Sequence, residues 1–369
     1  MARHIPTGQL VAVKKTNLDE CTEEELLQLM NEVLLSRLFR HPNLLTSRLV
    51  FCSSCQLWVL TPLMAYGSAD ALLRTYFPDG MSESLIAYLL YGVLKALEYL
   101  HRMGYVHRAV KASHRAVKAS HILLSEEGRV YLSGLHSIYS MMRDGKRMRA
   151  VFDMPHHSPA LLPWLSPELL RQDLHGYGLK SDIYSLGIVA CELVSGRVPF
   201  QDMPPTQMLL QKLRFHQMLL QKLRGSHCCL LDVAPFPLGE LGGLKVSRSG
   251  VDSGIGESVA TGSLSHSATA PPTDRPQSPG PKNHSATLHN LVQLCLQQQP
   301  ERRPSASELL SHAFFKQVKR HTRDSFLSLM YPAVPLTSPE DQPVSSPPGP
   351  LCYTSAVADS TDAVWDFSD

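Results

Sequence analysis

The chain has 369 residues, 43% of them hydrophobic and 18% charged, and a formal net charge of +2. This composition predicts a globular protein with a sizeable core, and the small net charge argues against a nucleic-acid or membrane partner. No apolar run reaches the roughly 20 residues of a bilayer-spanning helix, and the start MARHIPTGQL lacks the apolar segment of a secretory signal.

The first elements in chain order are short strands around one helix. Apolar and β-branched runs predict strands at Leu10–Lys15 and Gln56–Met64. Between them, Thr22 and Glu25 have the spacing of a capping box, which predicts the start of a helix. Apolar side chains then recur at helical period, at Leu26, Met30, Val33, Leu34 and Leu38.

The later elements are mostly helical. An amphipathic helix is predicted over 82–100, and a small hairpin around Glu127-Gly128. The segment 181–196 is apolar on all sides, which is typical of a buried helix. Further helices are predicted over 287–298 and 305–315, the second opened by another capping box.

Two regions and two duplications break this pattern. Residues 235–286 are rich in Gly, Ser, Pro and Thr and are predicted to be disordered, and the tail after Tyr331 is similar until its end, VWDFSD. The heptad HRAVKAS occurs twice over 107–120, and QMLLQKLR occurs twice over 207–224. Two copies are too few for a solenoid, so we interpret them as local duplications.

Two short motifs allow alternative interpretations. Cys52-Ser-Ser-Cys55 could be half of a zinc or redox site, but without a second pair it is better read as two reduced thiols between strands. We therefore predict no metal site. The basic run Lys146–Arg149 is better read as a solvated patch or partner contact than as a nuclear signal.

Seven segments, in order, resemble landmarks of the protein-kinase family. They are VAVK at 11–14, Glu32, HPNLL at 41–45, His107-Arg108, SPE at 166–168, DIYSLG at 182–187 and Arg303-Pro304. The resemblance implies an α+β, two-lobed kinase-like fold, with Lys14 paired to Glu32 and Glu168 paired to Arg303. It implies a partial N-lobe over 1–66, a mainly helical C-lobe over 67–322 with the insert at about 235–286, and a flexible tail over 323–369. The glycine-rich hairpin is missing from this truncated N-lobe, so we expect exposed sheet edges.

Three positions depart from what phosphoryl transfer needs. The catalytic aspartate position falls on Ala109 or Ala116, whose methyl groups accept no proton. The magnesium-binding asparagine position falls on His114 or His121, and imidazole is a poor ligand for this cation. Gly134 stands where the second metal carboxylate would be. The resemblance therefore implies a pseudokinase without catalytic residues.

Further segments resemble the STE20-related adaptor pseudokinases, the STRAD family, and LLRTYFPDGMSE and SGVDSGIGES are nearest to its beta form. This resemblance implies an allosteric activator of the liver kinase B serine/threonine kinase, acting in a heterotrimer with the mouse-protein-twenty-five scaffold, in cytoplasm and nucleus. The family anchors its scaffold through a C-terminal Trp-Glu-Phe, which Trp365-Asp366-Phe367 matches in type. The alternative is a chance aromatic pair in a disordered tail.

Two questions stay open at this level. Lys14 and Glu32 could hold ATP without magnesium, or they could only brace a helix against the sheet, and no cofactor is required by the adaptor interpretation. The alternative function is an atypical or weakly active ATP-binding kinase that uses Lys14, Lys111 or Lys118 with histidines.

Overall fold

The computed structural model describes residues 1–4, 8–107, 121–152, 162–171, 175–214, 284–320, 323–336 and 365–366. Helices and strands are both present, which confirms the expected α+β class. Within the described ranges, no helix is both long enough and apolar enough to cross a membrane.

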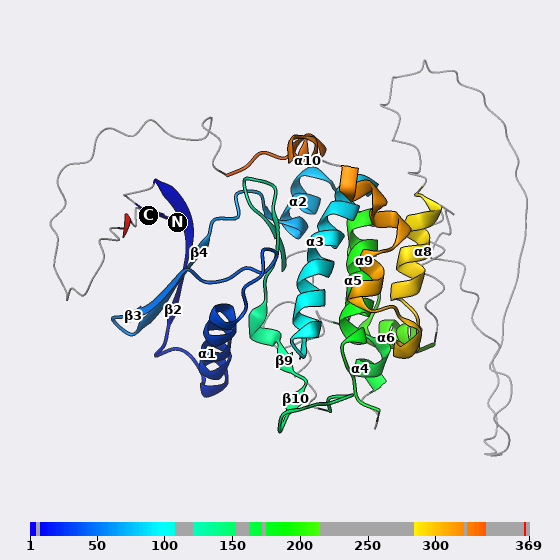
Figure 1. Cartoon of the computed structure of the whole chain (residues 1–369), viewed down its shortest axis with the longest axis horizontal. Helices are drawn as coiled ribbons and strands as arrows, with labels where there is room; N and C mark the ends of the chain where they lie inside the picture. The colour runs from blue at the N-terminus through cyan, green and yellow to red at the C-terminus, as the bar shows by residue number, and fades with distance from the viewer. Residues whose placement is uncertain are drawn as a thin grey trace, which may run out of the picture. The chain divides into compact units, whose positions relative to one another are not determined.

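The N-terminal part is a five-stranded antiparallel sheet in the order β12-β1-β2-β4-β3 (Figure 1). Its elements are β1 (Ala2–His4), β2 (Gln9–Asn17), α1 (Glu23–Leu38), β3 (Leu49–Ser53), β4 (Gln56–Pro62) and β12 (Trp365–Asp366). The two predicted strands are thus confirmed, and β4 ends two residues early. The expectation of an exposed edge was wrong for β1, because β12 pairs with it.

Helix α1 begins as predicted but faces an unexpected way. Thr22 accepts a hydrogen bond from Glu25 N, and the Glu25 carboxylate accepts one from Thr22 N, so the capping box is present. Of the predicted apolar row, Met30 is 54% and Leu34 is 64% exposed, whereas the neighbouring Leu35 is 7% exposed. The helix is turned so that Leu35 packs into the core and Glu32 faces the sheet.

The C-terminal part is mainly helical. Its first half contains β5 (Gly67–Ser68), α2 (Ala69–Tyr76), α3 (Glu83–Arg102), β6 (Tyr105–Val106), β7 (Ile122–Leu124), β8 (Val130–Leu132), the 3-10 helix η2 (Leu135–Ser137), β9 (Tyr139–Ser140), β10 (Met142–Arg143) and β11 (Lys146–Arg147). Its second half contains α4 (Pro167–Arg171), α5 (Lys180–Ser195), α6 (Pro205–Arg214), α8 (Ala286–Cys295), α9 (Ala306–Leu310), α10 (Arg323–Met330) and the 3-10 helices η4 (Pro300–Arg302) and η5 (Ala313–Arg320).

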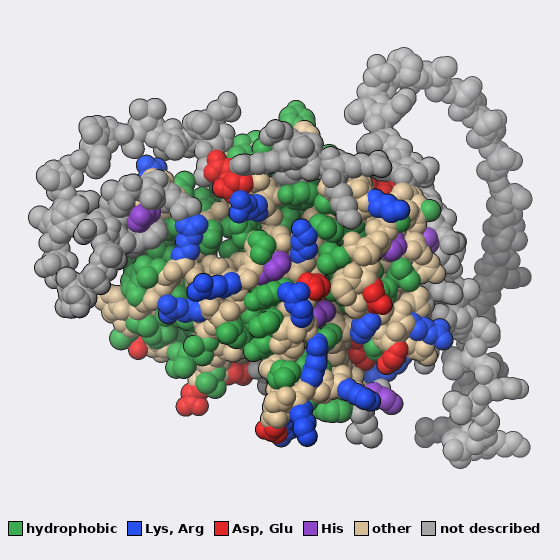
Figure 2. Space-filling view, viewed as in Figure 1, with side chains coloured by type: hydrophobic (Ala, Val, Ile, Leu, Met, Phe, Trp, Pro, Cys, Tyr) green, Lys and Arg blue, Asp and Glu red, His purple; other side chains and the backbone are tan. Residues whose placement is uncertain are grey.

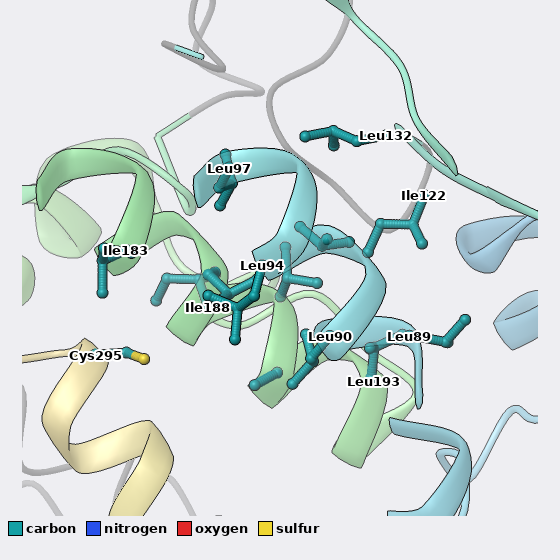
Figure 3. Packing of buried hydrophobic residues seen from close by; sticks show 14 of the residues in the cluster. Leu89, Leu90, Leu94, Leu97, Ile122, Leu132, Ile183, Ile188, Leu193 and Cys295 are labelled. Carbon is teal, nitrogen blue, oxygen red and sulfur yellow. The ribbon is translucent and has the colours of Figure 1, made fainter. Parts of the chain in front are cut away.

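One large core joins α3, α5 and α8. Ser82 caps α3 as its sequence predicts, and Leu94 of α3 lies near Ile188 of α5 (Figure 3). A Cβ on Gly187 would stand 2.8 Å from the Cβ of Cys295, so the glycine permits the close approach of α5 to α8. The prediction of a buried helix over 181–196 is confirmed, because its residues up to 194 are buried.

Two predicted helices have different boundaries. The one predicted over 287–298 is α8, which starts at Ala286 behind its N-cap Ser285. The sequence predicted a disordered insert over 235–286, but Ser285 and Ala286 belong to the start of α8. Residues 235–283 of the insert lie outside the described residues. The helix predicted over 305–315 breaks after α9, because His312 Nδ1 accepts a hydrogen bond from Phe314 N and starts a new turn.

The first copy of QMLLQKLR forms α6, and the second copy lies outside the described residues. Lys212 of α6 is 1% exposed and donates from Nζ to the carbonyls of Leu162, Pro163 and Leu165. Burial lowers the pKa of Lys212 well below its usual value. These three carbonyls compensate the ammonium group for its lost water, so α6 is fixed in place by a polar contact.

Candidate functional site

The predicted lysine–glutamate pair forms at the inner face of the N-terminal sheet. Lys14 lies on β2 opposite Val59, and Glu32 lies on α1. Lys14 Nζ is 3.6 Å from Glu32 Oε2, with the side chains 59% and 32% exposed. A pair this open to water contributes little to stability. Both residues line a cleft of about 470 Å³, which His136 also lines, and a smaller cavity of about 160 Å³ that reaches Ser133 and Gly134.

Gly134, where the sequence predicted the loss of a metal-binding carboxylate, has little room for a side chain. Gly134 follows β8 with a φ of +89°, and a Cβ built on it would stand 2.7 Å from Nδ1 and 2.9 Å from Cε1 of His121. His121 is held against Gly134 by its own backbone, because its carbonyl accepts from Ser133 N at 2.9 Å. The imidazole of His121 therefore fills the space in which a side chain at 134 would begin.

Three histidines line up at this point. The ring centroids of His107 and His121 are 6.5 Å apart, and those of His121 and His136 are 6.2 Å apart. Burial lowers the pKa of His136, with Glu32 opposing this effect and Lys14 adding to it. His136 is therefore coupled electrostatically to the Lys14–Glu32 pair.

His107 is hydrogen-bonded to Asp182 of α5. Its backbone N donates to Asp182 Oδ2 at 2.9 Å, its Nε2 bonds Ser133 O at 3.0 Å, and the same Asp182 oxygen is 2.8 Å from His101 Nε2. Burial lowers the pKa of His107; Asp182 opposes this, and the neighbouring His136 and His101 add to it. The ring is therefore neutral in the fold at neutral pH.

This burial predicts a pH-dependent stability. Because the folded pKa of His107 lies below the unfolded value of about 6.5, the unfolded chain binds more protons as the pH falls through that value. The free energy of unfolding should therefore fall between pH 7.5 and 5.5, measured by urea titration. The variant His107→Leu should show a smaller fall, whereas the exposed His175→Leu should keep the full one. Equal slopes in all three proteins would contradict the assignment.

The other predicted site residues are placed only in part. Ala109, His114, Ala116 and Phe367 lie outside the described residues; Trp365 and Asp366 form β12. Cys52 and Cys55 are free thiols, and within the described ranges no three His, Cys, Asp or Glu side chains gather as metal ligands.

The basic run at 146–149 lies on and after the β10–β11 hairpin. Lys146, Arg147 and Arg149 are exposed, together with Arg143 on the opposite strand. Lys and Arg side chains gather over this hairpin in Figure 2. Arg147 also donates a hydrogen bond to the carbonyl of His101, so the run is a surface patch that is partly tied to α3.

Sequence reasoning missed the contacts that cross the site. His136 follows Gly134 by two residues, but only the fold brings it beside Lys14 and Glu32. His101 carries no motif at all, and its bond to Asp182 joins α3 to α5. A histidine near the end of an amphipathic helix was the only available signal for it.

These residues do not fit a magnesium site. The cation prefers several oxygen ligands in octahedral geometry. Here Gly134 offers no carboxylate, and the closest side chain to it is the His121 imidazole. The cleft beside Lys14 is lined by Lys14, Lys15 and His136 together with Glu20, Glu25 and Glu32, so nitrogen groups and carboxylates are mixed there.

Comparison with known proteins gives concordant results. The family model described as "Protein kinase domain" matches residues 1–315. The chain is 53% identical to STE20-related kinase adapter protein beta of Mus musculus, covering 100% of this chain and 82% of that protein. It is 52% identical to the beta protein of Homo sapiens with the same coverage, and 47% identical to the alpha protein of Mus musculus, of which it covers 80%.

Proposed function

The chain belongs to the protein-kinase family and, within it, to the STE20-related kinase adapter proteins, and we propose that it is a catalytically inactive pseudokinase that acts as an adaptor for another kinase. One observation carries this proposal. The His121 ring occupies the space above Gly134, where an active kinase needs a metal-binding carboxylate. Ala109 and Ala116, the two readings of the catalytic aspartate position, support the same conclusion.

The partners proposed are the liver kinase B serine/threonine kinase and the mouse-protein-twenty-five scaffold, in a heterotrimer. An adaptor activates its partner when it binds the active conformer more tightly than the inactive one. The protein-kinase family of the chain and the name "kinase adapter" of its relatives support a kinase partner. The C-terminal Trp365-Asp366-Phe367 supplies two aromatic side chains of the kind that dominate protein interfaces.

Complex formation tests this assignment. Mixing the chain with the liver kinase and the scaffold should give a 1:1:1 species by light scattering on a sizing column. Truncation before Val364 should weaken scaffold binding at least tenfold and leave binding of the liver kinase intact. Failure of the full chain to join either partner would exclude the adaptor function.

We also propose that ATP binds in the Lys14 cleft without magnesium, since Lys14 offers an exposed ammonium and Gly134 offers no metal ligand. ATP with a chelator should then raise the melting temperature, and magnesium should add nothing. Lys14→Met should abolish the shift. Lys95→Met is the control, because Lys95 of α3 lies over the Tyr91 ring and does not line the cleft.

The alternative, an atypical or weakly active kinase, is favoured by the intact Lys14–Glu32 pair. It makes the opposite prediction in the same experiment: stabilisation by ATP would depend on magnesium. A shift that appears only with magnesium would therefore support the alternative and exclude metal-free binding.

A further inference from the structure

The C-terminal strand β12 lies on the edge of the N-terminal sheet. It runs antiparallel to β1, with Asp366 opposite Arg3 and Trp365 opposite His4, and Figure 1 shows it beside the N-terminus. The tail already reaches this sheet earlier, because Leu336 N donates to the carbonyl of Ala65, just after β4. The two termini of the described chain thus meet at one sheet edge.

The outer face of this sheet carries its own apolar cluster. Ala2, Val11 and Leu60 are buried, at 2%, 0% and 0% exposure, and the partly buried members of the cluster are Val13, Phe51 and Trp58. The cluster is separate from the large core. Helix α1 packs on the other face, where Glu32 meets Lys14. A sheet face of this kind is stable only when another layer covers it.

The strand register shows on which face of the sheet the residues of β12 lie. Residues directly opposite each other in an antiparallel pair share a face, and faces alternate along a strand. Ala2 lies opposite Val11 and His4 lies opposite Trp365, so position 365 is on the face of the apolar cluster. Strand addition of this type combines backbone hydrogen bonds with pockets for alternate side chains.

We propose that the C-terminal strand β12 (Trp365–Asp366) docks in cis by strand addition to β1, with position 365 on the outer apolar face of the N-terminal sheet. The consequence for partner binding rests on the proposed function, in which these same residues anchor the scaffold. Docked and anchored states then exclude each other, so cis docking lowers the apparent affinity of the scaffold. Because both segments belong to one chain, even a short strand pair competes effectively with a dilute partner.

Hydrogen exchange on the full chain tests the docking without any partner. In the variant Trp365→Ala/Phe367→Ala, amides of residues 1–11 should exchange about tenfold faster than in the parent chain. Amides of the buried α5 should be unchanged, which shows that the variant is folded. Equal exchange of residues 1–11 in both proteins would overturn the proposal whatever the scaffold does.

A variant of the docking surface on β1 tests whether cis docking competes with scaffold binding. Ala2→Gln places a polar side chain in the apolar cluster and leaves the C-terminal residues intact. Ala71→Gln makes the same change at an exposed position of α2 and is the matched control. Ala2→Gln should bind the scaffold about three- to tenfold more tightly than the parent, and Ala71→Gln should match the parent. Tail-dependent exchange with unchanged affinity in Ala2→Gln would overturn the competition. If no variant binds the scaffold, the proposed scaffold anchor is wrong. The hydrogen-exchange result still tests whether β12 docks on β1.

Discussion

Replacing Arg303 by Met should lower the free energy of unfolding by about 3–5 kcal/mol, the usual effect of removing one partner of a buried ion pair. Arg303 is 1% exposed, and its Nη1 and Nη2 donate to the two Glu168 oxygens at 2.6 and 2.8 Å. Its three other N–H groups donate to the carbonyls of Lys180, Gln297 and Gln298. All five donors are satisfied, so the side chain joins α4, α5 and the segment before α9.

Glu168 would be left charged and buried in this variant. Burial alone would raise the pKa of Glu168, but the hydrogen bonds and charge of Arg303 outweigh it and lower the pKa. The double variant Glu168→Leu/Arg303→Met should therefore recover more than half of the loss, because it removes both charges. The exposed neighbour Arg302→Met should change stability by less than about 0.5 kcal/mol. Urea titration measures all three, and a loss below about 1 kcal/mol in Arg303→Met would contradict the assigned role.

Restoring the carboxylate at 134 alone should fail. Gly134→Asp forces a side chain into a φ of +89° and sets its Cβ 2.7 Å from His121 Nδ1, so we expect a loss of about 1–3 kcal/mol. We expect no magnesium-dependent stabilisation by ATP. Gly134→Asp/His121→Asn removes the obstructing ring and supplies two oxygen ligands, so it should recover stability and gain a magnesium-dependent thermal shift.

Gly145 gives the matched control for this experiment. Its φ is +73°, but a Cβ there meets nothing within 4 Å. Gly145→Asp should therefore show only the backbone cost of an aspartate at positive φ, smaller than the loss in Gly134→Asp. If the two single variants lose the same stability, or if Gly134→Asp alone gains magnesium dependence, His121 does not close the metal position.

Local patterns made much of this fold predictable. The capping boxes at Thr22 and Ser305 and the cap at Ser82 act within three residues, so the sequence displays both partners. The buried helix α5 was visible from its composition. The partnership of Arg303 with Glu168 was expected only from the family resemblance, since 135 positions separate them.

The remaining features depend on contacts that spacing does not encode. Lys212 looks like an ordinary surface lysine on an amphipathic helix, and only the carbonyls of 162–165 make its burial possible. The helical spacing of apolar residues correctly predicted that α1 is a helix. Which of its sides faces the sheet is decided by the Lys14–Glu32 contact and the packing of Leu35. The pairing of β12 with β1 joins the two ends of the chain, and no local signal marks it.

The most direct test of the adaptor function is the rate of peptide phosphorylation by purified liver kinase B and scaffold, with and without this chain. A parallel reaction contains a liver kinase inactivated in its own catalytic site. If the chain is an allosteric adaptor, the rate should rise strongly with the active kinase and should not exceed background with the inactivated one. Phosphorylation that persists with the inactivated kinase would contradict the adaptor function, because this chain would then be the catalyst.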